Sequence, residues 1–200
     1  GDKIGIIGKT GSGKTTLLDI LMGLLEPSEG EFKIDSNLLD RHNTQKWQNI
    51  ISHVPQNIFL IDGTVAENIA FGISKDEIDI QKIERSIELA CLEDMLTKFE
   101  NGVDSKVGER GSQISGGQKQ RIGIARALYK GAEVIFLDEA TSALDSEVEH
   151  SVMESVTNLS EEITIIMVAH RLSSLKGCDR IYELSEGIMG QPKTFEEIIS

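Results

Sequence analysis

A glycine-rich run near the start of the chain has the residue types that cradle phosphate groups. The run Gly8-Lys9-Thr10-Gly11-Ser12-Gly13-Lys14-Thr15, followed by Thr16, fits the pattern GxxxxGK[ST] in full. Its glycines let the backbone curl so that successive N–H groups point at phosphate oxygens, and a following helix adds partial positive charge. Lys14 is expected to reach the β- and γ-phosphates, and Thr15 to offer its hydroxyl to Mg²⁺. Residues 8–16 therefore predict a site for a nucleoside triphosphate.

A second candidate group lies where an apolar run ends in two carboxylates. Val134-Ile135-Phe136-Leu137 is followed by Asp138 and Glu139. In P-loop ATPases the acid at such a strand end holds Mg²⁺, so we assign that role to Asp138. Glu139 is placed to act as the general base that polarises the attacking water. Half or more of isolated Asp-Glu pairs are plain solvated strand ends, but the phosphate loop upstream favours the functional interpretation.

A third motif is far more selective. The run Ile114-Ser115-Gly116-Gly117-Gln118-Lys119-Gln120-Arg121 resembles the LSGGQ signature of ATP-binding cassette (ABC) transporters, with Ile in place of the first Leu. It precedes a helix expected from about Gln118 to Tyr129, which makes an anion site at the helix N-terminus. Three further motifs of this family follow in order: Gln56 resembles the Q-loop, Asp145 in Ser142-Ala143-Leu144-Asp145 the D-loop, and His170 the switch histidine. The chain is thus identified as a member of the nucleotide-binding domains of ABC transporters.

The resemblance implies an ATPase that uses ATP and Mg²⁺. Gln56 would sense the metal and the attacking water beside Thr15 and Asp138, and His170 would bond the γ-phosphate. Two such domains would pair head to tail, so that Ser115, Gly116, Gly117 and Gln118 of one chain bind the ATP held by the phosphate loop of the other. Asp145 would couple the two sites. The expected partners are a second nucleotide-binding domain and membrane-spanning domains, with no nucleic acid, at the cytoplasmic face of a membrane.

Several stretches are typical of the exporter branch. Val107-Gly108-Glu109-Arg110-Gly111 resembles the X-loop of exporters, and Thr64-Val65-Ala66-Glu67-Asn68-Ile69 is also similar to exporters. The stretches 175–179 and 181–184 look like those of exporters of lipid-linked saccharides. Nothing in such a domain contacts cargo, so the sequence does not identify it.

Two alternatives remain open. A soluble ABC ATPase of translation or DNA repair would share the nucleotide motifs, but DNA-repair members carry a long coiled coil between the phosphate loop and the signature, and no sustained heptads occur there. Translation-type members lack the exporter X-loop. A regulatory domain that binds ATP without hydrolysing it is the other alternative, and the presence of Glu139 and His170 argues against it.

The motifs must be positioned by strands and helices, and the hydrophobic pattern predicts an α/β arrangement of these elements. Apolar runs at 3–7, 50–54, 134–137, 163–168 and 180–184 indicate strands covered on both faces, as in a parallel sheet. Amphipathic stretches at 15–22, 80–91, 117–129 and 148–159 indicate helices between them. We expect a P-loop NTPase core with a mainly parallel RecA-like sheet over 1–63 and 131–200, a small antiparallel patch near 31–35, and a helical subdomain inserted at 64–130.

Composition agrees with this interpretation. The chain has 20 Lys and Arg against 33 Asp and Glu, and this acidic balance counts against a nucleic-acid partner. The most apolar run, 163–169, is far shorter than the ~20 residues of a membrane span. Cys91 and Cys178 are far apart in the sequence, and we expect both to be reduced thiols. No aromatic residue precedes Lys14, although the family stacks one on adenine there, so we expect the first strands to be missing from this chain.

Overall fold

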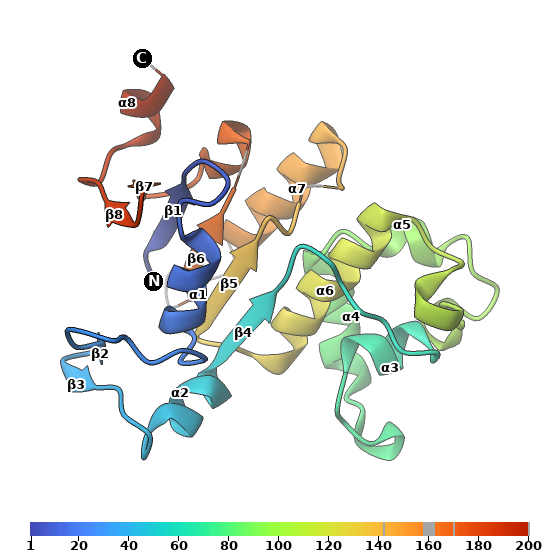
Figure 1. Cartoon of the computed structure of the whole chain (residues 1–200). Coiled ribbons are helices and arrows are strands. Elements are labelled where there is room, and N and C mark those ends of the chain that lie inside the picture. Colours follow the sequence, from blue (N-terminus) through green and yellow to red (C-terminus); the bar gives the residue numbers. More distant parts are fainter. Residues whose placement is uncertain (142, 158–162, 170, 200) are drawn as a thin grey trace. The chain divides into compact units, whose positions relative to one another are not determined.

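The computed structural model describes residues 1–141, 143–157, 163–169 and 171–199, and the chain divides into two compact units (Figure 1). The first unit consists of Gly1–His53, Ala132–Asp138 and Glu162–Ser200, and the second of Val54–Gly131 and Glu139–Glu161. Among the helices described, none is both long enough and apolar enough to cross a membrane.

A six-stranded sheet forms the framework of the first unit. Its strands lie in the order β4-β5-β6-β1-β7-β8, with bounds β1 Lys3–Ile7, β4 Ile51–Val54, β5 Val134–Asp138, β6 Thr164–Val168, β7 Arg180–Ser185 and β8 Ile188–Met189. β1 pairs in parallel with β6 and β7, and β5 in parallel with β6, whereas β8 returns antiparallel to β7. The expected mainly parallel sheet of a P-loop NTPase is therefore confirmed.

The small antiparallel patch is also present, as a hairpin of β2 Lys33–Ile34 and β3 Asn37–Leu38. It is shorter than the run expected at 31–35, because the chain turns at Asp35 and Ser36. Both turn residues have positive φ, 47° and 68°. Two-residue hairpin turns of type I′ require positive φ at both central positions, which Asp tolerates better than most residues.

The helices described in the first unit are α1 Lys14–Leu21, α2 Thr44–Ile50 and α8 Phe195–Ile199, with a 3₁₀ turn η4 at Leu172–Leu175. α1 and α2 pack on the sheet around one apolar cluster, whereas α8 has no buried residue. The cluster joins α1 and α2 to five strands, β1, β4, β5, β6 and β7, and comprises Ile6, Leu18, Met22, Trp47, Ile51, Phe136, Val168 and Leu184. The indole N–H of Trp47 donates to the carbonyl of Leu21 at 2.8 Å, which ties α2 to the end of α1. The helix that follows the glycine-rich run is thereby fixed to the sheet.

Helices dominate the second unit. They are α3 Val65–Ile69, α4 Ile80–Leu89, α5 Glu93–Leu96, α6 Gly116–Lys130 and α7 Ser146–Thr157, with 3₁₀ turns η1 Lys75–Glu77, η2 Gly102–Asp104 and η3 Glu109–Gly111. α6 packs against α3 and α4, and α4 packs against α3 and α7. Residues 64–130, all of which the structure describes, hold no strand beyond an isolated bridge between Thr64 and Lys106.

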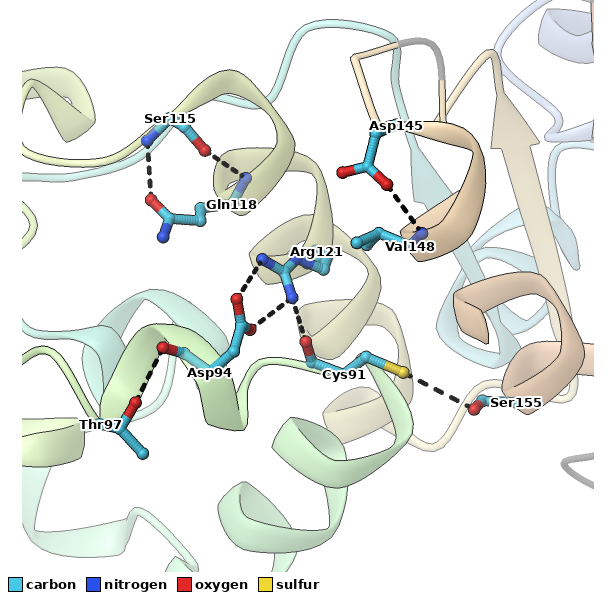
Figure 2. A network of polar contacts seen from close by, with 9 residues as sticks. All are labelled: Cys91, Asp94, Thr97, Ser115, Gln118, Arg121, Asp145, Val148 and Ser155. Atoms are coloured by element: carbon cyan, nitrogen blue, oxygen red, sulfur yellow. Dashed lines mark hydrogen bonds and ion pairs between the residues drawn. The ribbon is translucent and has the colours of Figure 1, made fainter. Parts of the chain in front are cut away.

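One buried cation anchors α6 within this unit (Figure 2). The Arg121 side chain is 8% exposed and forms an ion pair with Asp94 of α5, with 2.6 Å between Nη1 and Oδ1. A second bond joins Nη2 to Oδ2 at 3.3 Å, and Nη1 also donates to the carbonyl of Cys91. Planar two-bond pairing of this kind fixes direction as well as distance. It therefore sets the rotation of α6 relative to the 91–94 turn.

The apolar cluster of the first unit generates a stability prediction. Leu18 is 1% exposed and Leu24, in the loop after α1, is 61% exposed. Leu18→Ala should lower the free energy of unfolding by about 2–5 kcal/mol, since it leaves a cavity, whereas Leu24→Ala should change it by less than about 0.5 kcal/mol. Urea denaturation of both variants checks this, and equal losses would show that the cluster is not the core.

The Arg121 pair generates a pH prediction. The hydrogen bond from Arg121 is the main cause that holds the pKa of the Asp94 carboxyl below its ordinary value of 3.8. Between the lowered folded pKa and the unfolded one, the unfolded chain binds more protons, so stability rises with pH there and is lost as pH falls through the folded pKa. Below about pH 4 the protein should therefore lose stability more steeply than its Asp94→Asn variant. Thermal unfolding against pH measures this, with Asp76→Asn on the exposed η1 turn as control.

Candidate functional site

The glycine-rich run leaves β1 and enters α1 through a sharply curled loop. Gly13 caps the N-terminus of α1 with φ 102° and ψ 11°, a left-handed conformation that disfavours a side chain. Gly8 is held for a different reason: a Cβ there would lie 2.3 Å from the carbonyl oxygen of Leu184 and 2.6 Å from Ser12 Oγ. The loop therefore presses directly on β7, and a further bond from Gly187 N–H to the carbonyl of Ser12, at 3.1 Å, fixes its middle.

Two buried polar groups inside this loop have no charged partner in the part of the chain that the structure describes. The Lys14 ammonium, on a residue only 8% exposed, donates to the carbonyls of Gly8 at 2.7 Å and Lys9 at 3.1 Å. The Ser12 hydroxyl is buried with no hydrogen-bond partner among the described residues. Buried polar atoms are nearly always paired, so an orphaned hydroxyl beside a buried ammonium indicates a place for an anionic group.

The rest of the run is open to solvent. Lys9, Thr10 and Gly11 are exposed at the tip of the loop, and Thr15 and Thr16 are exposed on the first turn of α1. The first N–H groups of a helix have no intrahelical acceptor, and they carry the positive end of its dipole. The residues of 8–16 thus fit a nucleoside triphosphate, whose phosphates would complete the partners of Ser12 and Lys14.

Asp138 lies at the end of β5, the strand that pairs with β6. It is partly buried, in register with Val168. His53, on β4, is a neighbour that the sequence analysis missed: desolvation lowers the pKa of its imidazole, and the negative charges of Asp138 and Asp19 act in the opposite direction. Nothing in the sequence around His53 signals this, because the neighbours come from distant parts of the chain.

Within the second unit, the structure brings Gln56 and Glu139 together. The side-chain amide of Gln56 donates from Nε2 to Oε2 of Glu139 at 2.6 Å. Glu139 has φ 50°, an unfavourable backbone conformation for a residue with a side chain. Residues in such conformations persist where the surroundings hold them, and they gather at functional sites. The two residues assigned to the attacking water are therefore in direct contact.

The signature residues form the N-terminus of α6 (Figure 2). Ser115 caps the helix: its Oγ accepts from the N–H of Gln118 at 3.2 Å, and its own N–H donates to Oε1 of Gln118 at 2.8 Å. This reciprocal capping box starts the helix at Gly116, two residues before the expected start. The exporter-like loop just upstream is joined to the same helix, since Lys119 Nζ donates to the carbonyl of Arg110 at 2.9 Å.

Asp145 has an analogous role at α7. Its Oδ1 accepts from the N–H of Val148 at 3.0 Å, so it starts the helix at Ser146 (Figure 2). The turn before it is held by a buried pair, in which the Thr141 hydroxyl donates to Oε1 of Glu149 at 2.8 Å. Thr141 and Asp145 are thus each held by a hydrogen bond to a residue of α7.

The predicted site residues fall in both units. The phosphate loop and Asp138 belong to the first unit, and Gln56, Glu139, the signature and Asp145 to the second. His170 and Ser142 lie outside the described residues. Among those described, no three His, Cys, Asp or Glu side chains form a cluster that could hold a metal ion. Mg²⁺ in nucleotide sites usually has one or two carboxylates, waters and phosphate oxygens as ligands, which Asp138 and the hydroxyl of Thr15 would fit.

Comparisons with known proteins agree with these motifs. The ABC transporter family model matches residues 1–142. The chain is 40% identical to the ATP-dependent lipid A-core flippase of Ralstonia nicotianae, over all of this chain and 34% of that protein. It is 39% identical to ABC transporter B family member 17 of Arabidopsis thaliana, over all of this chain and 16% of that protein.

A solved structure has the same fold. A bacterial Atm1-family ABC exporter with ATP bound matches with a TM-score of 0.91 and 31% identity, over all of this chain and 35% of that one. The chain therefore spans about a third, or less, of the proteins it resembles. Relatives named as flippase and exporter favour the exporter interpretation over a soluble ATPase of translation or DNA repair. The chain belongs to the ABC transporter family, as the signature motif predicted.

Proposed function

We propose that this chain is the ATP-binding and ATP-hydrolysing domain of an ABC exporter. The observation that carries the proposal is the phosphate loop: among the described residues, the Lys14 ammonium has only carbonyl acceptors and the Ser12 hydroxyl has no hydrogen-bond partner. Both groups would gain charge-assisted hydrogen bonds from a triphosphate. Relatives named ATP-dependent lipid A-core flippases support a lipid-linked saccharide as the cargo of the whole protein.

Hydrolysis would depend on three sets of residues, which bind the phosphates, hold Mg²⁺ and activate the attacking water. Lys14 would hold the β- and γ-phosphates, and Thr15, Gln56 and Asp138 would hold Mg²⁺, which neutralises phosphate charge when bound. Glu139 would accept a proton from the attacking water, because its carboxylate is the group that the Gln56 amide already orients. The role of His170 at the γ-phosphate is likewise a proposal that rests on the family motif.

Binding and chemistry should separate in two variants. Lys14→Ala should weaken ATP binding by about 10- to 100-fold, since hydrogen bonds to charged groups contribute about 1.5–3 kcal/mol. Glu139→Gln should keep the binding and lower turnover by about 100-fold or more, because Gln preserves size and hydrogen bonding but is not a base. Calorimetry with ATP and a phosphate-release assay measure the two effects. Unchanged affinity in the first variant, or near-normal turnover in the second, would refute the assigned role.

The site would be completed by a second copy of the domain. We propose that residues 64–130 form the helical subdomain and that 1–63 and 131–200 form the ATP-binding core. Ser115–Gln118 would then bind the ATP of the partner domain, and Asp145 would couple the two sites. The capped N-terminus of α6 supports this role, because its first N–H groups can bind an anion. The remaining partners would be membrane-spanning domains, with this domain at the cytoplasmic face.

A bulky signature substitution tests the shared site. Ser115→Arg should leave ATP binding to a single domain within about twofold, because the phosphate loop is intact, but it should abolish closure of the pair and turnover. Light scattering with ATP follows dimer formation, and phosphate release follows turnover. Ser151→Arg, the same exchange on the exposed face of α7, should keep both. Full turnover of Ser115→Arg with no dimer detectable would contradict a site shared between chains.

A further inference from the structure

One face of α6 contacts two catalytic segments at once. Gly117, Gln120 and Gly123 recur every three residues, so they lie along the same side of the helix. The segment at 54–58, which carries Gln56, packs on this face. So does the segment at 143–144, which leads to Asp145. All of these residues belong to the second unit.

The side-chain amide of Gln120 bridges the two segments. Gln120 is 3% exposed, which is rare for an uncharged amide unless its polar atoms are paired. Its Oε1 accepts from the N–H of Ala143 at 2.9 Å, and its Nε2 donates a long bond, 3.5 Å, to the carbonyl of Gln56. Both partners are backbone groups, so the bridge fixes the course of the chain on each side rather than a side-chain rotamer.

The two glycines bring the helix backbone close enough for this bridge. A Cβ at Gly117 would lie 3.1 Å from Leu144 Cδ2 and 3.2 Å from the carbonyl oxygen of Ala143. A Cβ at Gly123 would lie 2.4 Å from Ile58 Cδ1. Ala143 is therefore held on both sides, through its N–H by Gln120 and through its carbonyl by close contact with Gly117.

We propose that Gln120 is a positioning residue for ATP hydrolysis. It holds the backbone of Gln56, whose side chain reaches Glu139 at 2.6 Å, in fixed register with the segment that leads to Asp145. The residues assigned to the water and to coupling between sites are thus tied to the helix that the signature begins. This inference rests on the proposed function, and Gln120 acts through its neighbours without touching the nucleotide.

The test variant is Gln120→Met in the full-length chain, since Met keeps the length and volume of the side chain without its amide. We expect kcat for ATP to fall by about tenfold or more, because small displacements of catalytic groups have effects of this size, with KM changed by less than about twofold. In a Gln56→Ala background, Gln120→Met should lower kcat by no more than about a further twofold, since both substitutions act through Gln56.

Asn68→Ala serves as the matched control. Asn68 is a fully buried amide of the same unit, and its bonds run to Ile61 and Thr64 rather than to the catalytic segments. The Asn68→Ala variant should lower the melting temperature at least as much as Gln120→Met does. It should leave kcat within about twofold, because the partners of Asn68 lie outside the segments 54–58 and 143–144. The proposal would be overturned if Gln120→Met and Asn68→Ala lost kcat equally, or if the losses of Gln120→Met and Gln56→Ala multiplied in the double variant. Either result would mean that Gln120 only stabilises the fold.

Amide hydrogen exchange tests the bridge independently of activity. Without the Gln120 acceptor, the N–H of Ala143 should lose protection in Gln120→Met and keep it in Asn68→Ala. Unchanged protection at Ala143 would overturn the bridge even in an active enzyme. The parent protein could instead hydrolyse no ATP while hydrogen exchange at Ala143 changes as expected. In that case the proposed function fails, and the catalytic role of Gln120 fails with it, but the bridge stands.

Discussion

Burial of the Lys14 ammonium is the constraint on which the first unit depends. An ammonium removed from water loses several kcal/mol of hydration, and the two neutral carbonyls that accept from it offset only part of this loss. The loop can curl over the ammonium only because Gly8 packs without a side chain against β7 and Gly13 is left-handed. A loop arranged in this way favours binding of a polyanion, because the polyanion provides the negative charge that pairs with the Lys14 ammonium.

The second unit depends in a similar way on α6. Different residues of this helix have different roles: the capping box at Ser115 fixes where it begins, Gln120 contacts the two segments proposed for catalysis, and Arg121 fixes its rotation through Asp94. Because Gln120 and Arg121 are adjacent, they point about 100° apart around the helix. An error in the rotation set by Arg121 would therefore displace the Gln120 amide from the backbone groups it bridges. In the proposed mechanism, packing and catalytic geometry are therefore linked through one helix.

The sequence predicted the elements whose signals are local. The strands at β1, β5, β6 and β7 appear as apolar runs, and the phosphate loop and signature are contiguous motifs. The short helices α2, α3 and α5 were missed because one or two turns give no periodicity to detect. α7 begins two residues earlier than expected because the Asp145 side chain caps it. The roles of Asp94, Gln120 and His53 could not be predicted, since each depends on partners distant in sequence.

The proposed roles of Asp138 and Glu139 fall on either side of the boundary between the two units. Asp138 is the last residue of a strand of the first unit, and the chain enters the second unit at Glu139, whose φ of 50° breaks the extended conformation. A continued strand would alternate the two side chains between opposite faces and leave both under the control of one sheet. The left-handed turn instead places Glu139 in a framework of its own, where it is held by Gln56 and followed by the pair of Thr141 and Glu149. The residues proposed as the metal-binding acid and as the general base are thus neighbours in sequence, while the contacts that hold each of them belong to different units.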